Sequence, residues 1–275
     1  MKKIIFVLFL SLMTTISVAD TVDYPTYFAG KSACFILFDL NKNKLLTEYN
    51  SSRCKEQIPP DSTFKVPLSL MAFDQKLITQ QTVFKWDGKE KGLSFWDQDQ
   101  TPHTWLMNSV VWVSQEITPK LGMDKIKNYL KLFQYGNQDF TGDPGENNGL
   151  THAWLESSLT ISGDEQFAFL KKLVMNALPV SQEAMTETKA NMYLETSPNG
   201  WKLYGKTGSG PIAEQPANVQ HYLEDGWAIG YVQKADQIYV FVLNLTDFEQ
   251  PKTSEQGGTR AKNIVKAILT KMGLY

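Results

Sequence analysis

The sequence predicts an α/β protein of the α+β type, in which an antiparallel sheet built from both chain ends is flanked by helices and carries an inserted helical subdomain. Three observations support this fold class. Apolar runs of strand length lie near the N-terminus and again in the last third, helical periodicity dominates the middle, and turn residues separate neighbouring strands. The 275 residues are 42% hydrophobic and 20% charged, which provides enough apolar side chains for a sizeable core.

The first residues have the pattern of an export signal. Two lysines precede an apolar run over residues 4–18, and small residues at 17–19 precede Asp20. This pattern is typical of a secretory signal peptide, and the run is short for a membrane span, although an uncleaved anchor is the alternative. We therefore expect a signal peptide over residues 1–19 and a periplasmic or secreted mature protein without a stable membrane anchor.

Two strands are predicted at the start of the sheet. Residues 33–38 form a compact apolar run, and turn residues separate it from a second strand over 45–49. Simple pairing across this turn places Cys34 opposite a residue near position 51, so Cys54 lies too far along unless the chain curls back. We therefore favour two unpaired, buried thiols, with a disulfide as the alternative that export would permit.

Helices fill the middle of the chain, and strands return in the last third. A double proline breaks the chain before Asp61 and Ser62, which form an N-cap signal for a helix through Leu77. Further helices are expected over 104–116, 123–133, 151–156, 163–178 and 259–272, and further strands over 201–204, 227–232 and 238–245. The result is a single domain over 20–275, with a sheet subdomain at about 20–61 and 197–275 and a helical subdomain at about 62–196.

Charge and motif content argue against several classes of function. The net charge is −2, and no basic block is long enough to predict a nucleic-acid partner. The histidines at 103, 152 and 221 lack metal-ligand spacing, and there is no C-x-x-C motif, so no metal site is expected. The absence of G-x-S-x-G argues against a Ser-His-Asp hydrolase.

One motif could form a nucleophilic centre at the start of the first long helix. Ser62-Thr63-Phe64-Lys65 matches S-x-x-K, and residues three apart on a helix share a face, so the lysine amine can reach the serine hydroxyl. The serine N–H at a helix start is free to stabilise an oxyanion. Residues 52–55 also match, but they precede a double proline where no helix would align the pair. The context favours Ser62 and Lys65.

A second motif follows the strand predicted at 201–204. Lys206-Thr207-Gly208 at a strand edge can bind a substrate carboxylate, and the glycine leaves room for close approach. Together with Gly200 the segment is also a literal P-loop match. We reject that interpretation because no helix can begin at residues 208–211, whereas a P-loop requires one there.

The order of five motifs is more specific than any one of them. The order is Ser62 to Lys65, Ser109-Val110-Val111, Tyr135-Gly136-Asn137, Trp154, and Lys206-Thr207-Gly208. It resembles the class D (oxacillinase-type) serine β-lactamases along essentially the whole mature chain, with a fold of the β-lactamase/transpeptidase type. The middle motif is not S-D-N, which argues against class A enzymes and many transpeptidases.

The resemblance implies a role for each motif. Ser62 attacks the β-lactam carbonyl, Lys65 becomes N6-carboxylated by carbon dioxide or bicarbonate and acts as general base, and Ser109 relays a proton. The remaining implied residues are Trp154, Val111 and Leu155 around the carbamate, Ser62 and Ser209 as oxyanion donors, and Lys206, Thr207, Gly208, Ser209 and Arg260 around the substrate. No further cofactor is implied. Independently of the resemblance, Lys65 has apolar neighbours in the sequence, and burial would favour its neutral form.

Two alternatives and several properties stay open. A β-lactam-sensing domain, which acylates without turnover, shares these motifs, and so does a penicillin-binding transpeptidase. The resemblance implies antibiotic resistance through hydrolysis of small β-lactams such as penicillins. It leaves open the breadth of the substrate spectrum and whether the protein is a monomer or a homodimer.

Overall fold

The computed structural model describes residues 22–213, 215, 217 and 220–275, so the predicted signal peptide lies outside the described residues. The strands are β1 Lys31–Asp39, β2 Lys44–Tyr49, β3 Tyr193–Thr196, β4 Lys202–Pro211, β5 Glu224–Lys234 and β6 Gln237–Asp247. The α-helices are α1 Tyr24–Tyr27, α2 Lys65–Asp74, α3 Pro102–Met107, α4 Val111–Leu121, α5 Met123–Phe133, α6 Gly149–His152, α7 Gly163–Val174, α8 Gln182–Asn191 and α9 Gly257–Lys271. Short 3-10 helices are η1 Arg53–Lys55, η2 Asp61–Phe64 and η3 Ser94–Trp96.

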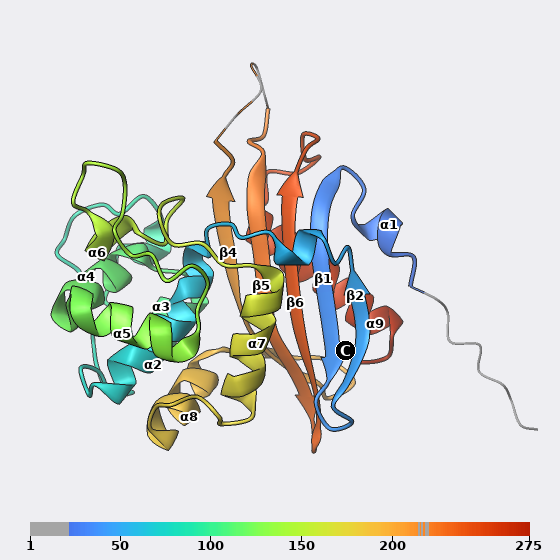
Figure 1. Ribbon diagram of the computed structural model, residues 1–275, viewed down its shortest axis with the longest axis horizontal. Helices are drawn as coiled ribbons and strands as arrows, with labels where there is room; N and C mark the ends of the chain where they lie inside the picture. Colours follow the sequence, from blue (N-terminus) through green and yellow to red (C-terminus); the bar gives the residue numbers. More distant parts are fainter. Residues whose placement is uncertain (1–21, 214, 216, 218–219) are drawn as a thin grey trace, which may run out of the picture.

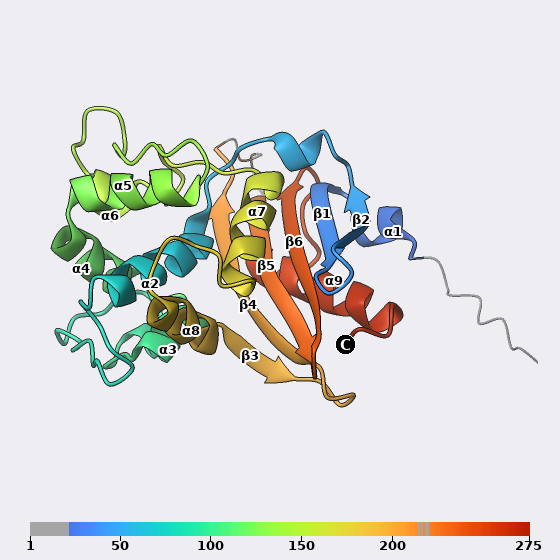
Figure 2. The same ribbon diagram turned by 60° about the horizontal axis from the view of Figure 1, so that its bottom comes forward.

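The sheet has the order β2-β1-β6-β5-β4-β3, and all its pairs are antiparallel. The N-terminal hairpin lies beside β6 from the C-terminal third, which confirms a sheet built from both chain ends. Helix α7 covers one face and α9 the other, and α2 to α6 gather beyond the β4 side (Figure 1). Figure 2 shows the same helical group beside β4 from a second direction.

Alternating strand residues supply two cores, one on each face of the sheet. Ile36 of β1 and Val242 of β6 point toward α7 and the helical group, whereas Leu37 and Leu243 point toward α9. This period of two is the pattern expected for strands buried on both faces. The larger core, on the α7 side, continues without interruption into the helical group, so sheet and helices share one apolar interior.

Several predicted helices differ from the structure at their ends. The helix expected over 104–116 is two helices, α3 and α4, because Ser109 between them adopts a left-handed backbone with φ of 56°. The helix that was expected to extend through Leu77 ends at Asp74. The strand expected over 201–204 continues to Pro211, so the whole Lys206 motif lies on β4.

The expectation of two free thiols was wrong, because Cys34 and Cys54 form a disulfide with a Cα–Cα distance of 4.9 Å. Pairing across the hairpin places Phe35 opposite Tyr49, as simple register predicts. The chain then curls back at Asn50, which has a φ of 58°, and η1 carries Cys54 over β1. The chain after Tyr49 therefore does not continue in the direction of β2, which is what the sequence-based pairing had assumed.

Within the described residues, no helix combines the length and the apolar character needed to span a bilayer.

Candidate active site

The nucleophile motif lies on a tight turn that leads into a buried helix. Ser62 is in η2, and Lys65 is the first residue of α2. The Lys65 Nζ donates a hydrogen bond of 3.1 Å to the Ser62 Oγ. Ser62 is partly accessible while Lys65 is fully buried, so the hydroxyl faces the outside of the site and the amine the inside.

The predicted N-cap role of Asp61 was wrong. Pro60 occupies the cap position of η2, and the Asp61 side chain makes no cap hydrogen bond with the described residues. The φ of Asp61 is 49°, in the left-handed region of backbone conformation. Pro67 does not strain α2, because it lies in the first turn, where a backbone N–H has no intrahelical partner.

A buried hydrogen-bond network holds the turn in place. The Thr63 hydroxyl donates to the Pro60 carbonyl at 2.6 Å, and the Gln166 amide of α7 donates to the Thr63 hydroxyl at 2.9 Å. On the other side, the Trp227 indole of β5 donates to the Pro59 carbonyl at 2.9 Å. The turn is therefore held by both the helical layer and the sheet. The sequence contains no motif that identifies Gln166.

Lys65 lies in an apolar environment that favours its neutral form. The ring of Phe64 stacks on that of Trp154 at 5.4 Å, and Phe140 stacks on the same indole at 5.9 Å. Burial lowers the pKa of Lys65 to about 7. An amine with this pKa is partly unprotonated near neutrality, as the predicted role requires.

The Trp154 indole N–H is buried and has no hydrogen-bond partner among the described residues. A buried donor without an acceptor is costly, and such a group is often explained by a partner that is not a protein atom. Val111 begins α4 and is half-buried, and Leu155 is half-buried against the main core. Their predicted contact with a carbamate stays a prediction.

Ser109 of the helical group and Lys206 of β4 are in direct contact. The Lys206 Nζ donates to the Ser109 Oγ and, at 2.8 Å, to the Thr207 carbonyl. Lys206 is buried, and burial followed by the charge of Lys65 holds the pKa of Lys206 well below its usual range. Ser62, Lys65, Ser109 and Lys206 thus form one site.

Strand β4 packs directly against the nucleophile turn at Gly208. A Cβ at this position would lie 2.9 Å from the Pro60 carbonyl oxygen and 3.3 Å from the Thr63 methyl group. Only glycine leaves room for this approach. The strand continues through residues 208–211, which supports rejecting the P-loop interpretation.

Ser209 and Arg260 have partners on the α9 side. The Ser209 hydroxyl accepts a 2.8 Å hydrogen bond from the Gly258 N–H at the start of α9. The Arg260 guanidinium donates to both Asp247 carboxylate oxygens at 2.6 and 2.7 Å, and it lies 3.4 Å from Glu224. Arg260 is buried with these carboxylates, and its predicted contact with a substrate stays a prediction.

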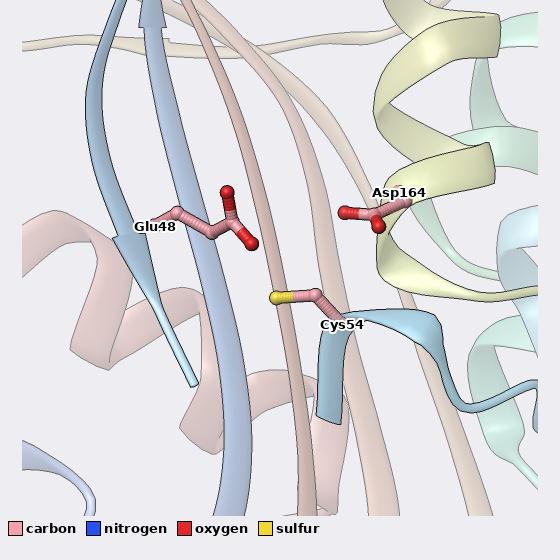
Figure 3. Close-up of side chains that lie close together, drawn as sticks. All are labelled: Glu48, Cys54 and Asp164. Carbon is pink, nitrogen blue, oxygen red and sulfur yellow. The ribbon is translucent and has the colours of Figure 1, made fainter. Parts of the chain in front are cut away.

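The competing S-x-x-K match has no comparable geometry. Ser52 and Lys55 are exposed on the turn around η1, and Cys54 between them is in the disulfide. In the described part of the chain, one cluster has metal-ligand geometry, formed by Glu48, Cys54 and Asp164 (Figure 3). Metal binding there would need a Cys54 thiolate, and its sulfur is bonded to Cys34. This cluster is therefore not a metal site.

Comparison with known proteins agrees with this geometry. The model of the penicillin binding protein transpeptidase domain matches residues 33–270. The chain is 51% identical to Beta-lactamase OXA-1 of Escherichia coli over 228 residues, which are 82% of this chain and 80% of that protein. The chain belongs to the class D β-lactamase family. It is also 35% identical to Beta-lactamase OXA-9 of Klebsiella pneumoniae, over 83% of this chain and 84% of the relative.

Solved structures give the same family assignment. The structure of Class D beta-lactamase BAT-2 superposes with a TM-score of 0.79 at 32% identity, over 94% of this chain and 98% of that one. The C-terminal domain of the Bacillus licheniformis BlaR penicillin-receptor superposes equally well, with a TM-score of 0.80 at 33% identity over 92% and 96%. The class D fold is therefore common to enzymes and receptors, and fold alone does not separate them.

Proposed function

We propose that this class D family member hydrolyses β-lactams through an acyl-enzyme on Ser62, and that it confers resistance to these antibiotics. The observation that supports the proposal most strongly is the 3.1 Å hydrogen bond from a buried Lys65 to the Ser62 hydroxyl. An amine of lowered pKa beside a serine hydroxyl is the arrangement that activates a nucleophile. The 51% identity to Beta-lactamase OXA-1 favours an enzyme over a receptor.

Residues from the helical group carry out the proton transfers, and residues of the sheet bind the substrate. Lys65 removes the Ser62 proton as the hydroxyl oxygen attacks the lactam carbonyl, and the backbone N–H groups of Ser62 and Ser209 stabilise the oxyanion. Ser109 passes a proton to the departing ring nitrogen. Lys206 and Thr207 bind the substrate carboxylate from β4. Water then cleaves the ester, and Ser62 is regenerated.

We also propose that Lys65 is carboxylated on Nζ. Carbon dioxide reacts with the neutral amine, which loses one proton, and the resulting carbamate would supply the general base for both acylation and ester hydrolysis. The buried Trp154 N–H without a partner among the described residues fits such a group, because a carbamate oxygen would accept its hydrogen bond. The apolar neighbours of Lys65 favour the neutral amine that must react.

The Cys34–Cys54 disulfide supports export, because disulfides persist in oxidising compartments outside the cytoplasm. We therefore propose a periplasmic or secreted protein whose first 19 residues are a signal peptide. Turnover of a chromogenic cephalosporin tests the main proposal. Many turnovers per protein are expected, whereas one equivalent of stable acyl-protein would identify a receptor instead.

A further inference from the structure

The carboxyl groups of Asp61 and Glu156 both lie over strand β4, close to the nucleophile motif. Asp61 directly precedes the nucleophile and is buried, whereas Glu156 follows Trp154 by two residues and is exposed. Both lie over the same face of β4. A Cβ at Gly208 would come within 3.2 Å of the Asp61 Cβ, and one at Gly210 would overlap the Glu156 carboxyl group. Glycine at these alternate positions leaves the space in which the two carboxyl groups lie.

The burial of Asp61 requires a proton on its carboxyl group. Both carboxyl oxygens of Asp61 are buried without a hydrogen-bond partner among the described residues, and the Glu156 carboxyl group lies over the same face of β4, two positions along the strand. Ionised carboxylates only accept hydrogen bonds, so two of them cannot bond to each other. An ionised carboxylate is strongly disfavoured in the interior where no donor reaches it, so Asp61 carries a proton at neutral pH and can donate it in a hydrogen bond to Glu156.

Burial decides which group carries that proton, because Asp61 is enclosed by the protein whereas Glu156 reaches solvent. Burial, the contact with Glu156 and the charge of Asp225 all hold the pKa of Asp61 well above its usual range, while Lys65 opposes them. Burial also raises the pKa of Glu156, as do the charges of Asp225 and Glu224, but the contact with Asp61 lowers it. Asp61 is therefore the protonated partner, and it donates to a Glu156 carboxylate that solvent can reach.

We propose that the proton shared by Asp61 and Glu156 keeps Asp61 uncharged, and that an uncharged Asp61 leaves the neighbouring Lys65 amine neutral. If Asp61 were ionised, its charge would stabilise the buried ammonium, and an adjacent opposite charge shifts a pKa by about 1–3 pH units. Such an ammonium could neither accept the Ser62 proton nor react with carbon dioxide. Asp61 and Glu156 are thus positioning residues that act through Lys65.

The charge on Lys65 can be measured without substrate. The protein is labelled with ¹³Cε-lysine, the Lys65 signal is assigned by its loss in Lys65→Ala, and it is titrated in bicarbonate-free buffer. Asp61→Asn should shift the Lys65 titration by less than about half a pH unit, since Asp61 is already uncharged. Glu156→Gln should raise the Lys65 pKa, because Asp61 then ionises more easily. Asp61→Asn combined with Glu156→Gln should restore the original titration.

Two further variants complete the titration experiment. Gly210→Ala displaces the Glu156 carboxyl group and should act in the same direction as Glu156→Gln. Glu183→Gln removes an exposed charge on α8 and should leave the titration unchanged. If Asp61→Asn lowers the Lys65 pKa by about one pH unit or more, Asp61 is ionised in the native protein and the proposal is wrong. An unchanged titration in Glu156→Gln also overturns it.

The catalytic consequence rests on the proposed carbamate, and labelled bicarbonate separates the two ideas. With ¹³C-bicarbonate, Glu156→Gln should show a weaker carbamate signal than the native protein, and the double variant should recover it. If the Lys65 titrations behave as expected but no variant forms a carbamate, the inference on Asp61 is supported and the proposed carboxylation of Lys65 is wrong. If every variant forms the carbamate equally and shows the same Lys65 titration, the carbamate is supported as general base and the inference on Asp61 is wrong.

Discussion

Lys206 of β4 donates a hydrogen bond to the hydroxyl of Ser109, which lies 97 residues earlier between α3 and α4. This contact joins the sheet to the helical group directly beside the Ser62–Lys65 pair. Ser109 has a left-handed backbone and lies between the end of α3 at Met107 and the start of α4 at Val111. The sequence pattern suggested a continuous helix through this segment, whereas the structure has two helices with Ser109 between them.

Replacement of Ser62 should separate the two S-x-x-K matches. Ser62→Ala is expected to eliminate covalent labelling by a fluorescent penicillin, because no other serine lies within hydrogen-bonding reach of the Lys65 amine in the described part of the chain. Ser52→Ala removes an exposed hydroxyl and should label like the native protein. Labelling that survives in Ser62→Ala and disappears in Ser52→Ala would reverse the assignment of the nucleophile.

Trp154→Phe should weaken carboxylation of Lys65. The substitution removes the indole N–H but keeps an aromatic ring against Phe64. A hydrogen bond to a charged group contributes about 1.5–3 kcal/mol, so the apparent affinity for bicarbonate should fall roughly 10–150-fold. Activity measured against bicarbonate concentration, after its removal at mildly acidic pH, gives this value. Saturating bicarbonate should restore much of the activity, and a lack of response in the native protein would count against the carbamate.

The pH dependence of acylation should follow Lys65. Burial lowers the pKa of this amine to about 7, so the neutral form increases as the pH rises through that value. The acylation rate should therefore fall below about pH 7 and reach a plateau above it. Stopped-flow acylation in bicarbonate-free buffer, where Lys65 is an unmodified amine, measures this profile. An acidic limb centred near the ordinary carboxyl range would instead indicate that a carboxylate, and not the Lys65 amine, controls the rate.

Arg260→Ala should act mainly on stability. The guanidinium is buried in a bidentate pair with Asp247, and removal of one partner from a buried ion pair costs about 3–5 kcal/mol. Chemical unfolding should show this loss, and Lys266→Ala, which removes a half-exposed pair with Glu195, serves as a control with a small effect. If stability is unchanged while KM rises strongly, Arg260 binds the substrate carboxylate, as the resemblance implied.

The sequence by itself determined the class of fold and the order of the motifs, and it predicts Ser62 as the nucleophile. Strand and helix periodicity are local properties, so the sheet from both chain ends and the helical middle could be predicted from them. The S-x-x-K spacing is also local, and a double proline was enough to favour Ser62 over Ser52. The P-loop interpretation could be rejected on local grounds as well, since residues 208–211 cannot begin a helix.

Only the tertiary structure decided the relationships between segments that are distant in the chain. The disulfide depends on a left-handed turn at Asn50, and the Lys206–Ser109 contact involves another at Ser109, which sequence patterns do not reveal. The partners of Arg260 and the meeting of Asp61 with Glu156 depend on which side chains fold together. Burial then sets the charge of Lys65, because desolvation is a property of the packed interior and not of the motif.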